Sequence, residues 1–231
     1  MALRVLLTND DGIDAPGLLA LERAASVFAE VVIIAPMHEQ SGCGHQVTTH
    51  AAIAVEGRGG ARWAVDGTPA DCVRLGLHGL AGRVDWVLSG INAGGNLGTD
   101  IYHSGTVAAA REAALHGVPG MAISHLRRRG VAISWDDAAL RAQAALAELL
   151  GTRPPRSCYW NLNLAHLDPG TPIAPLERCP LDPSPLPLAY AQDPEDGSFR
   201  YAGDYHRRSR EPGSDVERCM AGATTLTELR L

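Results

Sequence analysis

The chain has 231 residues, which is enough for one sizeable α/β domain with an appendage. Hydrophobic residues make up 45% and charged residues 20%, a composition typical of a globular protein. Its formal net charge of −6 argues against nucleic-acid duplex as the main partner, because such binders carry a basic surface. No apolar run in the sequence reaches the length of a membrane span, and acidic residues occur too early for a signal peptide. We therefore expect a cytoplasmic protein without a membrane partner. The five cysteines include no CxxC pair and predict neither a disulfide framework nor a zinc ribbon.

The segment RVLLTNDDGIDAPG, residues 4–17, places two adjacent carboxylates directly after a short apolar run. The run predicts a buried strand, and Pro16 begins a predicted helix. Asp10 and Asp11 therefore follow a strand, at the edge of the sheet where α/β proteins bind ligands. Gly12 permits the turn that the two side chains need to face one centre. Taken alone, NDDG is also an ordinary turn and helix cap.

The next segments predict a second strand, a glycine-containing loop, a hairpin and a helix. The strand is EVVIIA, residues 30–35, and the loop MHEQSGCGHQ contains Ser41. Residues 48–55 and 61–65 predict the two strands of the hairpin, and a helix is expected to start near Pro69. The histidines of this region have a spacing that fits no helical pair, so we do not expect a histidine metal site.

Residues 84–124 predict a βαβ unit in which RVDWVLSG and VPGMAIS are strands and SGTVAAAREAALHG is the helix. The loop before the helix offers the side-chain amides of Asn92 and Asn96. Residues 104–106 lie at the helix entrance, where free backbone amides favour an anion. A plain N-cap explains Ser104 by itself but not the whole loop.

The C-terminal third of the chain differs in composition from the rest. Residues 134–150 predict a helix and residues 158–165 a strand, but eleven of the fifteen prolines lie in residues 154–212. That segment is expected to be mostly extended, and it leads to the strand-like stretches FRYAGDY and ATTLTELRL. Such a tail is either a small subdomain or an arm that reaches a partner subunit.

Two carboxylates, a hydroxyl and an amide form a set of oxygen ligands that suits Mg²⁺, Mn²⁺ or Ca²⁺ rather than zinc. A divalent ion beside a helix N-terminus is typical of a phosphoryl site. The chain contains no lysine, which excludes a Walker A lysine, a Schiff-base lysine and phosphatases that place a lysine at the phosphate. The first loop lacks GxGxxG, and its acids would repel a pyrophosphate, so a dinucleotide oxidoreductase is disfavoured.

Four motifs, in this order, resemble those of the SurE family, the survival-protein-E 5′-nucleotidases: TNDDG with a downstream APG, SG within EQSGCGH, GTPADCV, and SGINAGGNLGTDIYHSGTVAAAREAALHGVP. The resemblance covers residues 4–124. It implies a Rossmann-like α/β domain over residues 1–190, with a mostly parallel sheet and flanking helices. It also implies an extended C-terminal arm over residues 191–231 and a homodimer or homotetramer.

The resemblance further implies hydrolysis of nucleoside 5′-monophosphates with one Mg²⁺ or Mn²⁺ per subunit, or Ca²⁺ in a crystal. The family's metal ligands fall on Asp10, Asp11, Ser41 and Asn92. Its phosphate contacts fall on Asn96, Ser104, Gly105 and Thr106. The two aspartates are the candidate catalytic residues, and whether Asp10 acts as base or nucleophile stays open. His103 stands where the family usually has tyrosine and is a candidate neighbour of the substrate.

This interpretation has three alternatives. Nucleoside 3′-monophosphates and short polyphosphate are further candidate substrates. A haloacid-dehalogenase-type phosphatase needs carboxylates two positions apart and usually a lysine, whereas Asp10 and Asp11 are adjacent and the chain has no lysine. A sensor that binds metal and nucleotide without turnover would use the same residues.

Overall fold

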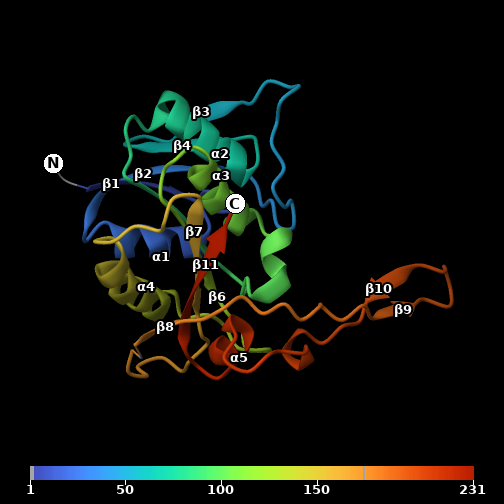
Figure 1. The fold of residues 1–231 in the computed structure, drawn as a ribbon. Helices are drawn as coiled ribbons and strands as arrows, with labels where there is room; N and C mark the ends of the chain where they lie inside the picture. The colour runs from blue at the N-terminus through green and yellow to red at the C-terminus, as the bar shows by residue number, and fades with distance from the viewer. Residues whose placement is uncertain (1–2, 174) are drawn as a thin grey trace.

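The computed structural model describes residues 3–173 and 175–231 and shows a nine-stranded sheet with helices on both faces (Figure 1). The strands of this sheet, in spatial order, are β3 (Val55–Gly57), β4 (Arg62–Val65), β2 (Ala29–Pro36), β1 (Leu3–Thr8), β5 (Trp86–Asn92), β6 (Gly120–His125), β7 (Cys158–Leu164), β11 (Thr224–Arg230) and β8 (Leu176–Arg178). The helices are α1 (Pro16–Ala25), α2 (Pro69–Leu75), α3 (Gly105–Leu115), α4 (Trp135–Leu149) and α5 (Asp215–Met220). Short helical turns are η1 (Gly76–Leu80), η2 (Gly98–Tyr102) and η3 (Tyr205–Arg207), and β9 (Tyr190–Gln192) and β10 (Phe199–Tyr201) form a separate hairpin.

The centre of the sheet is parallel. Strands β4, β2, β1, β5, β6 and β7 are neighbours in that order and all run the same way. They read as continuous apolar runs because helices cover both of their faces. All six residues of β6 and four of the six residues of β1 are buried. The prediction of a mostly parallel α/β sheet is confirmed.

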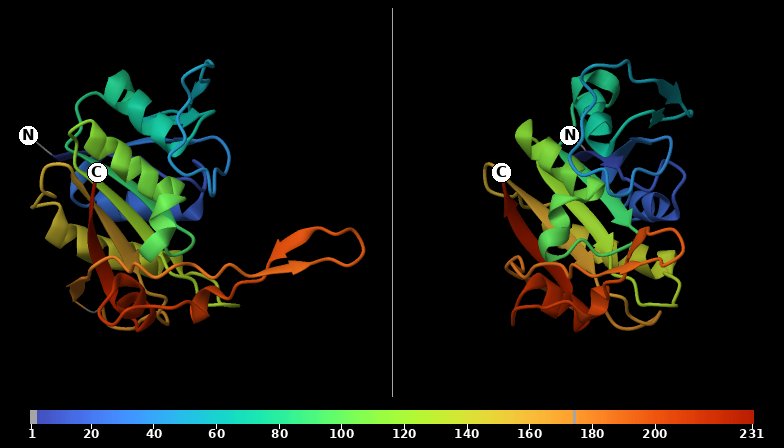
Figure 2. Two further views of the ribbon diagram at one scale, coloured as in Figure 1. Left: turned by 45° about the vertical axis from the view of Figure 1, so that its right-hand side comes forward. Right: turned by 90° about the vertical axis from the view of Figure 1, so that its right-hand side faces the viewer.

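Helices α1 and α4 cover one face of the sheet, and α2 and α3 cover the other (Figure 2). The core on the first side includes Leu18 and Leu21 of α1, and that on the second includes Val73 of α2 and Ala109 of α3. Parallel strands connected by helices on both faces place all the strand-to-helix loops at one edge. None of the described helices has the length and apolar character to cross a membrane.

The predicted hairpin is shorter than expected. Only β3, residues 55–57, pairs with β4, and Val55 lies opposite Val65. The expected strand over residues 48–54 does not form, because Thr48 is bound to a helix and not to a neighbouring strand. Its backbone amide and its hydroxyl each lie 2.8 Å from the carboxylate of Asp71 in α2.

The C-terminal segment divides into a projecting part and a part that returns to the sheet. Strands β9 and β10 pair only with each other and extend away from the body (Figures 1 and 2). Strand β11 instead inserts between β7 and β8, so the second strand-like stretch of the tail has a local partner that the sequence did not reveal. The boundary between residues 190 and 191 stays a prediction, but the extension does not project as a whole.

Candidate active site

Three loops meet at the carboxyl edge of the parallel sheet, after the adjacent strands β2, β1 and β5. Asp10 and Asp11 follow β1, Ser41 lies in the loop after β2, and Asn92 is the last residue of β5. The amide of Gln40 donates to the backbone carbonyl of Asp10 at 2.7 Å, which joins the first two loops. The amide of Ala93 donates to Asp11 Oδ2 at 3.2 Å, which joins the first loop to the third. Segments far apart in the sequence are therefore held in direct contact around the acid pair.

The loop after β1 turns sharply at Gly12, as expected. Gly12 has φ +104°, a conformation that residues with a side chain rarely adopt. The side-chain amide of Asn9 donates to the Gly12 carbonyl at 2.8 Å, and the Ile13 amide donates to the Pro36 carbonyl at 2.9 Å. These bonds close the turn and attach it to the end of β2.

Asp10 lies under the first turn of α3 and is only 4% exposed. The hydroxyl of Thr106 donates to its Oδ1. A Cβ at Gly105 would lie 3.1 Å from Asp10 Oδ2, so a glycine permits this close approach of helix and acid. Burial raises the pKa of Asp10 to about 6, the bond from Thr106 opposes this rise, and repulsion from Asp11 adds to it.

Asp11 is less buried but is also destabilised as a carboxylate. Burial is the main cause that raises its pKa, the hydrogen bond from Ala93 opposes the rise, and the charge of Glu39 adds to it. Three acidic side chains thus influence one small region, and the chain supplies no lysine to balance them. A cation would relieve this repulsion.

The remaining atoms are suited to a hard divalent cation. Asn92 donates its side-chain amide to the Gly94 carbonyl at 2.9 Å, which leaves its oxygen available. Ser41 is exposed, and its hydroxyl donates to Glu39 Oε1 at 2.7 Å. Carboxylate, amide and hydroxyl oxygens are the ligands that Mg²⁺ and Mn²⁺ accept. Among residues 3–173 and 175–231, no group of three or more His, Cys, Asp or Glu side chains is arranged to hold a metal, so a site here depends on the neutral oxygens as well.

Three of the four candidate phosphate contacts, Ser104, Gly105 and Thr106, lie at the entrance of α3, but their roles differ. Ser104 is the N-cap and accepts from the Val107 amide at 3.1 Å, while Thr106 is fully buried and its hydroxyl is occupied by Asp10. Since the cap occupies the Val107 amide and Asp10 is also bonded by the Thr106 backbone, the amide of Gly105 is the first-turn group best placed for an anion. The function of these residues as phosphate contacts stays a prediction.

Asn96 is fixed by polar residues that the sequence analysis did not single out. Its backbone amide donates to Asn163 Oδ1 at 2.9 Å, and its carbonyl accepts from the side chains of Asn163 at 3.0 Å and Asn161 at 2.8 Å. Its own side-chain amide donates to Ser124 Oγ at 2.8 Å. The signal in the sequence was the pair of asparagines inside the apolar strand YWNLNLA, since buried amides need partners.

His103 is exposed, between η2 and α3. Its carbonyl accepts from the Gly44 amide at 3.2 Å, which ties the loop after β2 to the entrance of α3. Its proximity to the substrate stays a prediction.

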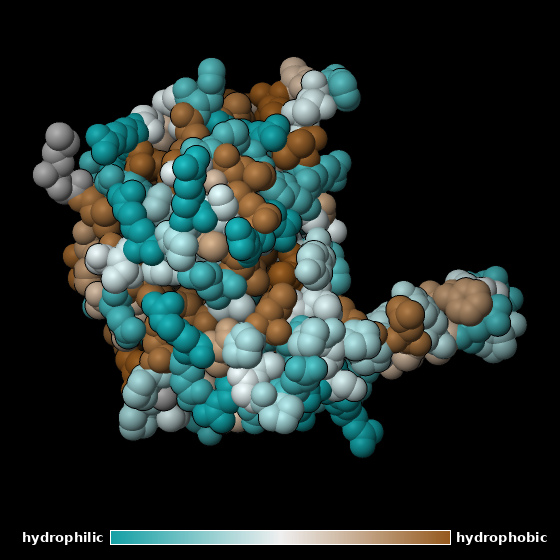
Figure 3. All heavy atoms as spheres, viewed as in Figure 1, coloured by the Kyte–Doolittle hydropathy of each residue, from teal (hydrophilic) through white to brown (hydrophobic). Residues whose placement is uncertain are grey.

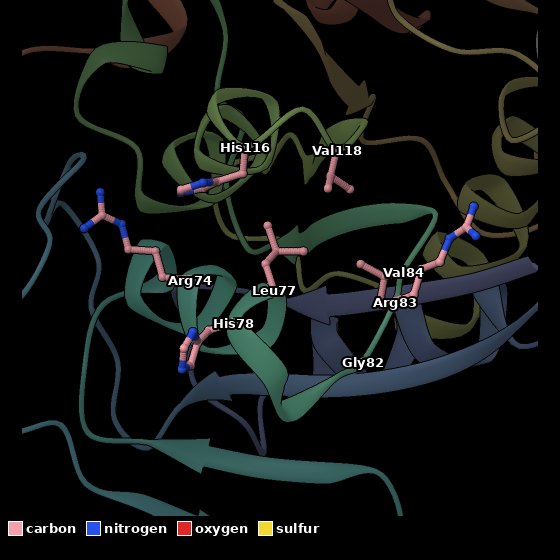
Figure 4. Close-up of a pocket in the computed structure, with 8 residues that line it drawn as sticks. All are labelled: Arg74, Leu77, His78, Gly82, Arg83, Val84, His116 and Val118. Carbon is pink, nitrogen blue, oxygen red and sulfur yellow. The ribbon is translucent and has the colours of Figure 1, made fainter.

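A separate hollow of about 490 Å³ lies at the opposite edge of the sheet (Figure 4). Val84 and Val118, which precede β5 and β6, form part of its apolar lining with Leu77. Its basic residues include Arg74 in the last turn of α2 and His116 at the end of α3. Basic groups are favoured at helix C-termini, where the helix dipole is negative, and this explains them without a ligand.

The fold and the acid pair together define an α/β protein with a candidate metal and anion site at the carboxyl edge of its sheet. The sequence matches the family described as Survival protein SurE over residues 5–180. It is 48% identical, over 99% of this chain and 100% of the relative, to the protein named "Putative 5′-nucleotidase alr3139" of Nostoc sp. strain PCC 7120. It is 38% identical, over 98% of this chain and 89% of the relative, to the protein named 5′-nucleotidase SurE of Rhodospirillum rubrum.

The crystal structure of the SurE protein from Aquifex aeolicus has the same fold, with a TM-score of 0.83 and 31% identity. The superposition covers 98% of this chain and 93% of that chain. The chain belongs to the SurE family, as the four sequence motifs indicated.

Proposed function

We propose that this chain is a divalent-metal-dependent 5′-nucleotidase that hydrolyses nucleoside 5′-monophosphates to nucleoside and phosphate. As a member of the SurE family it is an enzyme of the 5′-nucleotidase class. Relatives with this name support the conclusion, because the chain aligns with most of their length. The main support for metal dependence is the buried carboxylate of Asp10, which lies beside Asp11 and under the entrance of α3. Mg²⁺ or Mn²⁺ is the cation that fits the oxygen set.

Asp10, Asp11, Ser41 and Asn92 would hold the cation. When bound, it supplies charge neutralisation at the phosphate and polarises the reacting groups. The acid pair alone would repel a dianionic phosphomonoester, so the chain needs this compensation before the substrate can approach.

The chain itself binds and orients the reacting groups. Backbone amides at the start of α3 point toward the carboxyl edge and bind the phosphate oxygens. Thr106 fixes Oδ1 of Asp10, so Oδ2 is the oxygen left to contact the reacting groups. Asn96, clamped through its backbone by Asn163, contributes its side chain to the same edge.

The test is phosphate release from AMP or GMP by the purified protein with added Mn²⁺ or Mg²⁺, with and without excess EDTA. We expect activity that EDTA abolishes and the metal restores. Asp10→Asn should lower turnover by about 10²-fold or more, because it removes a group that acts in the reaction. Asp11→Asn should mainly weaken metal binding. Ser104→Ala should have a smaller effect, since the backbone amides remain.

Full activity in EDTA, or near-normal turnover of Asp10→Asn, would contradict the metal site. Metal-dependent binding of AMP without any phosphate release would instead identify a nucleotide sensor. Phosphate release from 3′-AMP and from short polyphosphate in the same assay defines the breadth of the substrate class. We also propose a cytoplasmic homodimer or homotetramer, for which the projecting hairpin is the candidate contact.

A further inference from the structure

The loop after β2, residues 37–47, contains two glycines just after the candidate metal ligand Ser41. Gly42 and Gly44, which flank Cys43, have φ of +77° and +60°. Ser41 is exposed, and its hydroxyl is bonded within the loop, to Glu39. The Ser41 side chain thus makes no bond to the acid pair, and the link between the two loops at this point is the backbone amide of the preceding Gln40, which donates to the Asp10 carbonyl.

The tip of this loop is attached to the body of the protein by the backbone bond from Gly44 to His103 and by one side chain. Within residues 41–45, all of which the structure describes, His45 is the only residue whose side chain forms a hydrogen bond outside the loop. Its Nε2 lies 2.6 Å from Glu112 Oε2, and its Nδ1 lies 3.4 Å from Nη1 of Arg111. Because a guanidinium only donates, Nδ1 accepts and Nε2–H donates to Glu112. A neutral imidazole thus satisfies both contacts.

Glu112 is a rigid attachment point. It belongs to α3, its side chain is 1% exposed, and its other oxygen Oε1 accepts from Arg74 at 2.5 Å and from His116 at 2.9 Å. Burial by itself would raise the pKa of Glu112, but the bonds from His45, Arg74 and His116 outweigh it and lower the pKa to about 2. The carboxylate stays charged, and two of its partners do not depend on the loop.

The same helix fixes both sides of the site. Thr106 in the first turn of α3 holds Asp10, and Glu112 further along α3 holds His45. We propose that His45 is a positioning residue. Its bond to Glu112 anchors the loop after β2 to α3 and so helps to hold Ser41 beside Asp10 and Asp11. The inference rests on the proposed metal site and adds to it the residue that pre-assembles its most exposed ligand.

The experiment compares two histidines that bind the same carboxylate. His45→Ala and His116→Ala each remove one hydrogen bond to Glu112, but only the first removes an attachment of the loop, because His116 lies at the end of α3 itself. The backbone bonds of Gln40 to Asp10 and of Gly44 to His103 remain in both variants. Mn²⁺ affinity is measured on the full chain from the electron paramagnetic resonance signal of free Mn²⁺. We expect His45→Ala to weaken Mn²⁺ binding about tenfold and His116→Ala less than twofold. His45→Gln, which keeps a donor near the position of Nε2, should recover most of the affinity.

Hydrogen exchange of the amides of residues 41–46, measured without metal, gives a second result that does not need the metal site. We expect faster exchange there in His45→Ala and unchanged exchange in His116→Ala. If both variants weaken Mn²⁺ equally, or if exchange in the loop is unchanged in His45→Ala, the proposal is wrong. A wild-type protein that binds no Mn²⁺, with the loop still loosened by His45→Ala, would overturn the proposed metal site and support the anchoring contact.

Discussion

Asp10 has opposite consequences for stability and for function. In the metal-free protein its pKa is raised from 3.8 to about 6, first because the carboxyl is buried. The native state then binds this proton more tightly than the unfolded state, so between about pH 4 and pH 6 the free energy of unfolding falls as pH rises. Above pH 6 the full cost remains, at most about 3 kcal/mol for such a shift. Binding of the proposed cation above pH 6 would offset that cost.

We therefore expect Asp10→Asn to stabilise the metal-free protein at pH 7.5 while it abolishes turnover. The melting temperature in EDTA should rise by roughly 5 °C, following the usual relation between free energy and melting temperature for a chain of this size. At pH 4 the difference should disappear, because the wild-type carboxyl is then protonated. The measurement is thermal unfolding at both pH values, with the exposed Asp14→Asn of the same loop as control. A lower melting temperature for Asp10→Asn at pH 7.5 would show that burial is not the dominant effect on this carboxyl.

The sequence predicted the position of Asp10 and Asp11 in the chain better than the long-range contacts that hold them. Asp10 and Asp11 were found from the strand that precedes them, which is local information. The bond from Thr106 joins residues 96 positions apart and depends on how α3 approaches β1. The contact between His45 and Glu112, 67 positions apart, is of the same kind. Such contacts follow from packing and have no short-range pattern.

At the scale of elements, α1 lies so close to the site that its second residue must lack a side chain. A Cβ at Gly17 would lie 2.0 Å from the carbonyl oxygen of Ile91 in β5 and 3.0 Å from the ring of Trp135. Alanine is the better helix former by about 1 kcal/mol, so propensity alone predicts that Gly17→Ala stabilises α1. The clash with a backbone atom reverses this expectation.

Gly17→Ala should lower the free energy of unfolding by about 1–3 kcal/mol, the usual cost of overpacking. It should also weaken Mn²⁺ binding, because the displaced strand end carries Asn92. Urea unfolding and Mn²⁺ titration measure the two effects. Gly151→Ala is the control, since a Cβ there would meet no atom within 4 Å. If Gly17→Ala is as stable as Gly151→Ala, the close approach of α1 to β5 is not a constraint on the fold.

The central strands and the helices α1, α3 and α4 were predictable because each is an apolar or periodic run, and α2 was predictable because Pro69 marks its start. The elements that were missed or misassigned are short or held by side chains. Residues 48–54 resemble a strand, but Asp71 binds Thr48 and removes it from the sheet. Helix α5 has six residues, and β8 has three residues within the proline-rich segment. Their formation depends on tertiary contacts more than on local propensity.

At the scale of the whole molecule, the return of β11 to the sheet could not be inferred from the tail alone. Its buried residues include Leu226 and Leu229, which would suit any buried strand. The strand pairs with β7 and β8 because of the route that the long extended connection takes. The prolines of that connection do not specify the route. The body of the protein thus includes the last strand, and of the described strands only β9 and β10 lie outside its sheet.

The projecting hairpin carries apolar side chains among hydrophilic ones at its surface (Figure 3). Leu188 is 91% exposed, Phe199 66%, Tyr190 60% and Tyr201 53%. Exposed apolar groups concentrated on one element indicate a protein interface. Because β9 and β10 pair only with each other, removing them leaves the nine-stranded sheet intact.

We expect a variant in which a short Gly-Ser linker replaces residues 188–202 to fold with a lower oligomeric state. Light scattering after size exclusion gives the mass, and circular dichroism with a melting curve verifies the fold. Deleting residues 224–231 is the contrasting variant, because it removes β11 from between β7 and β8 and should prevent folding of the body. An unchanged mass for a folded hairpin deletion would exclude the hairpin as the subunit contact. A lower mass with unchanged phosphate release per subunit would show that the site at the sheet edge is complete within one chain.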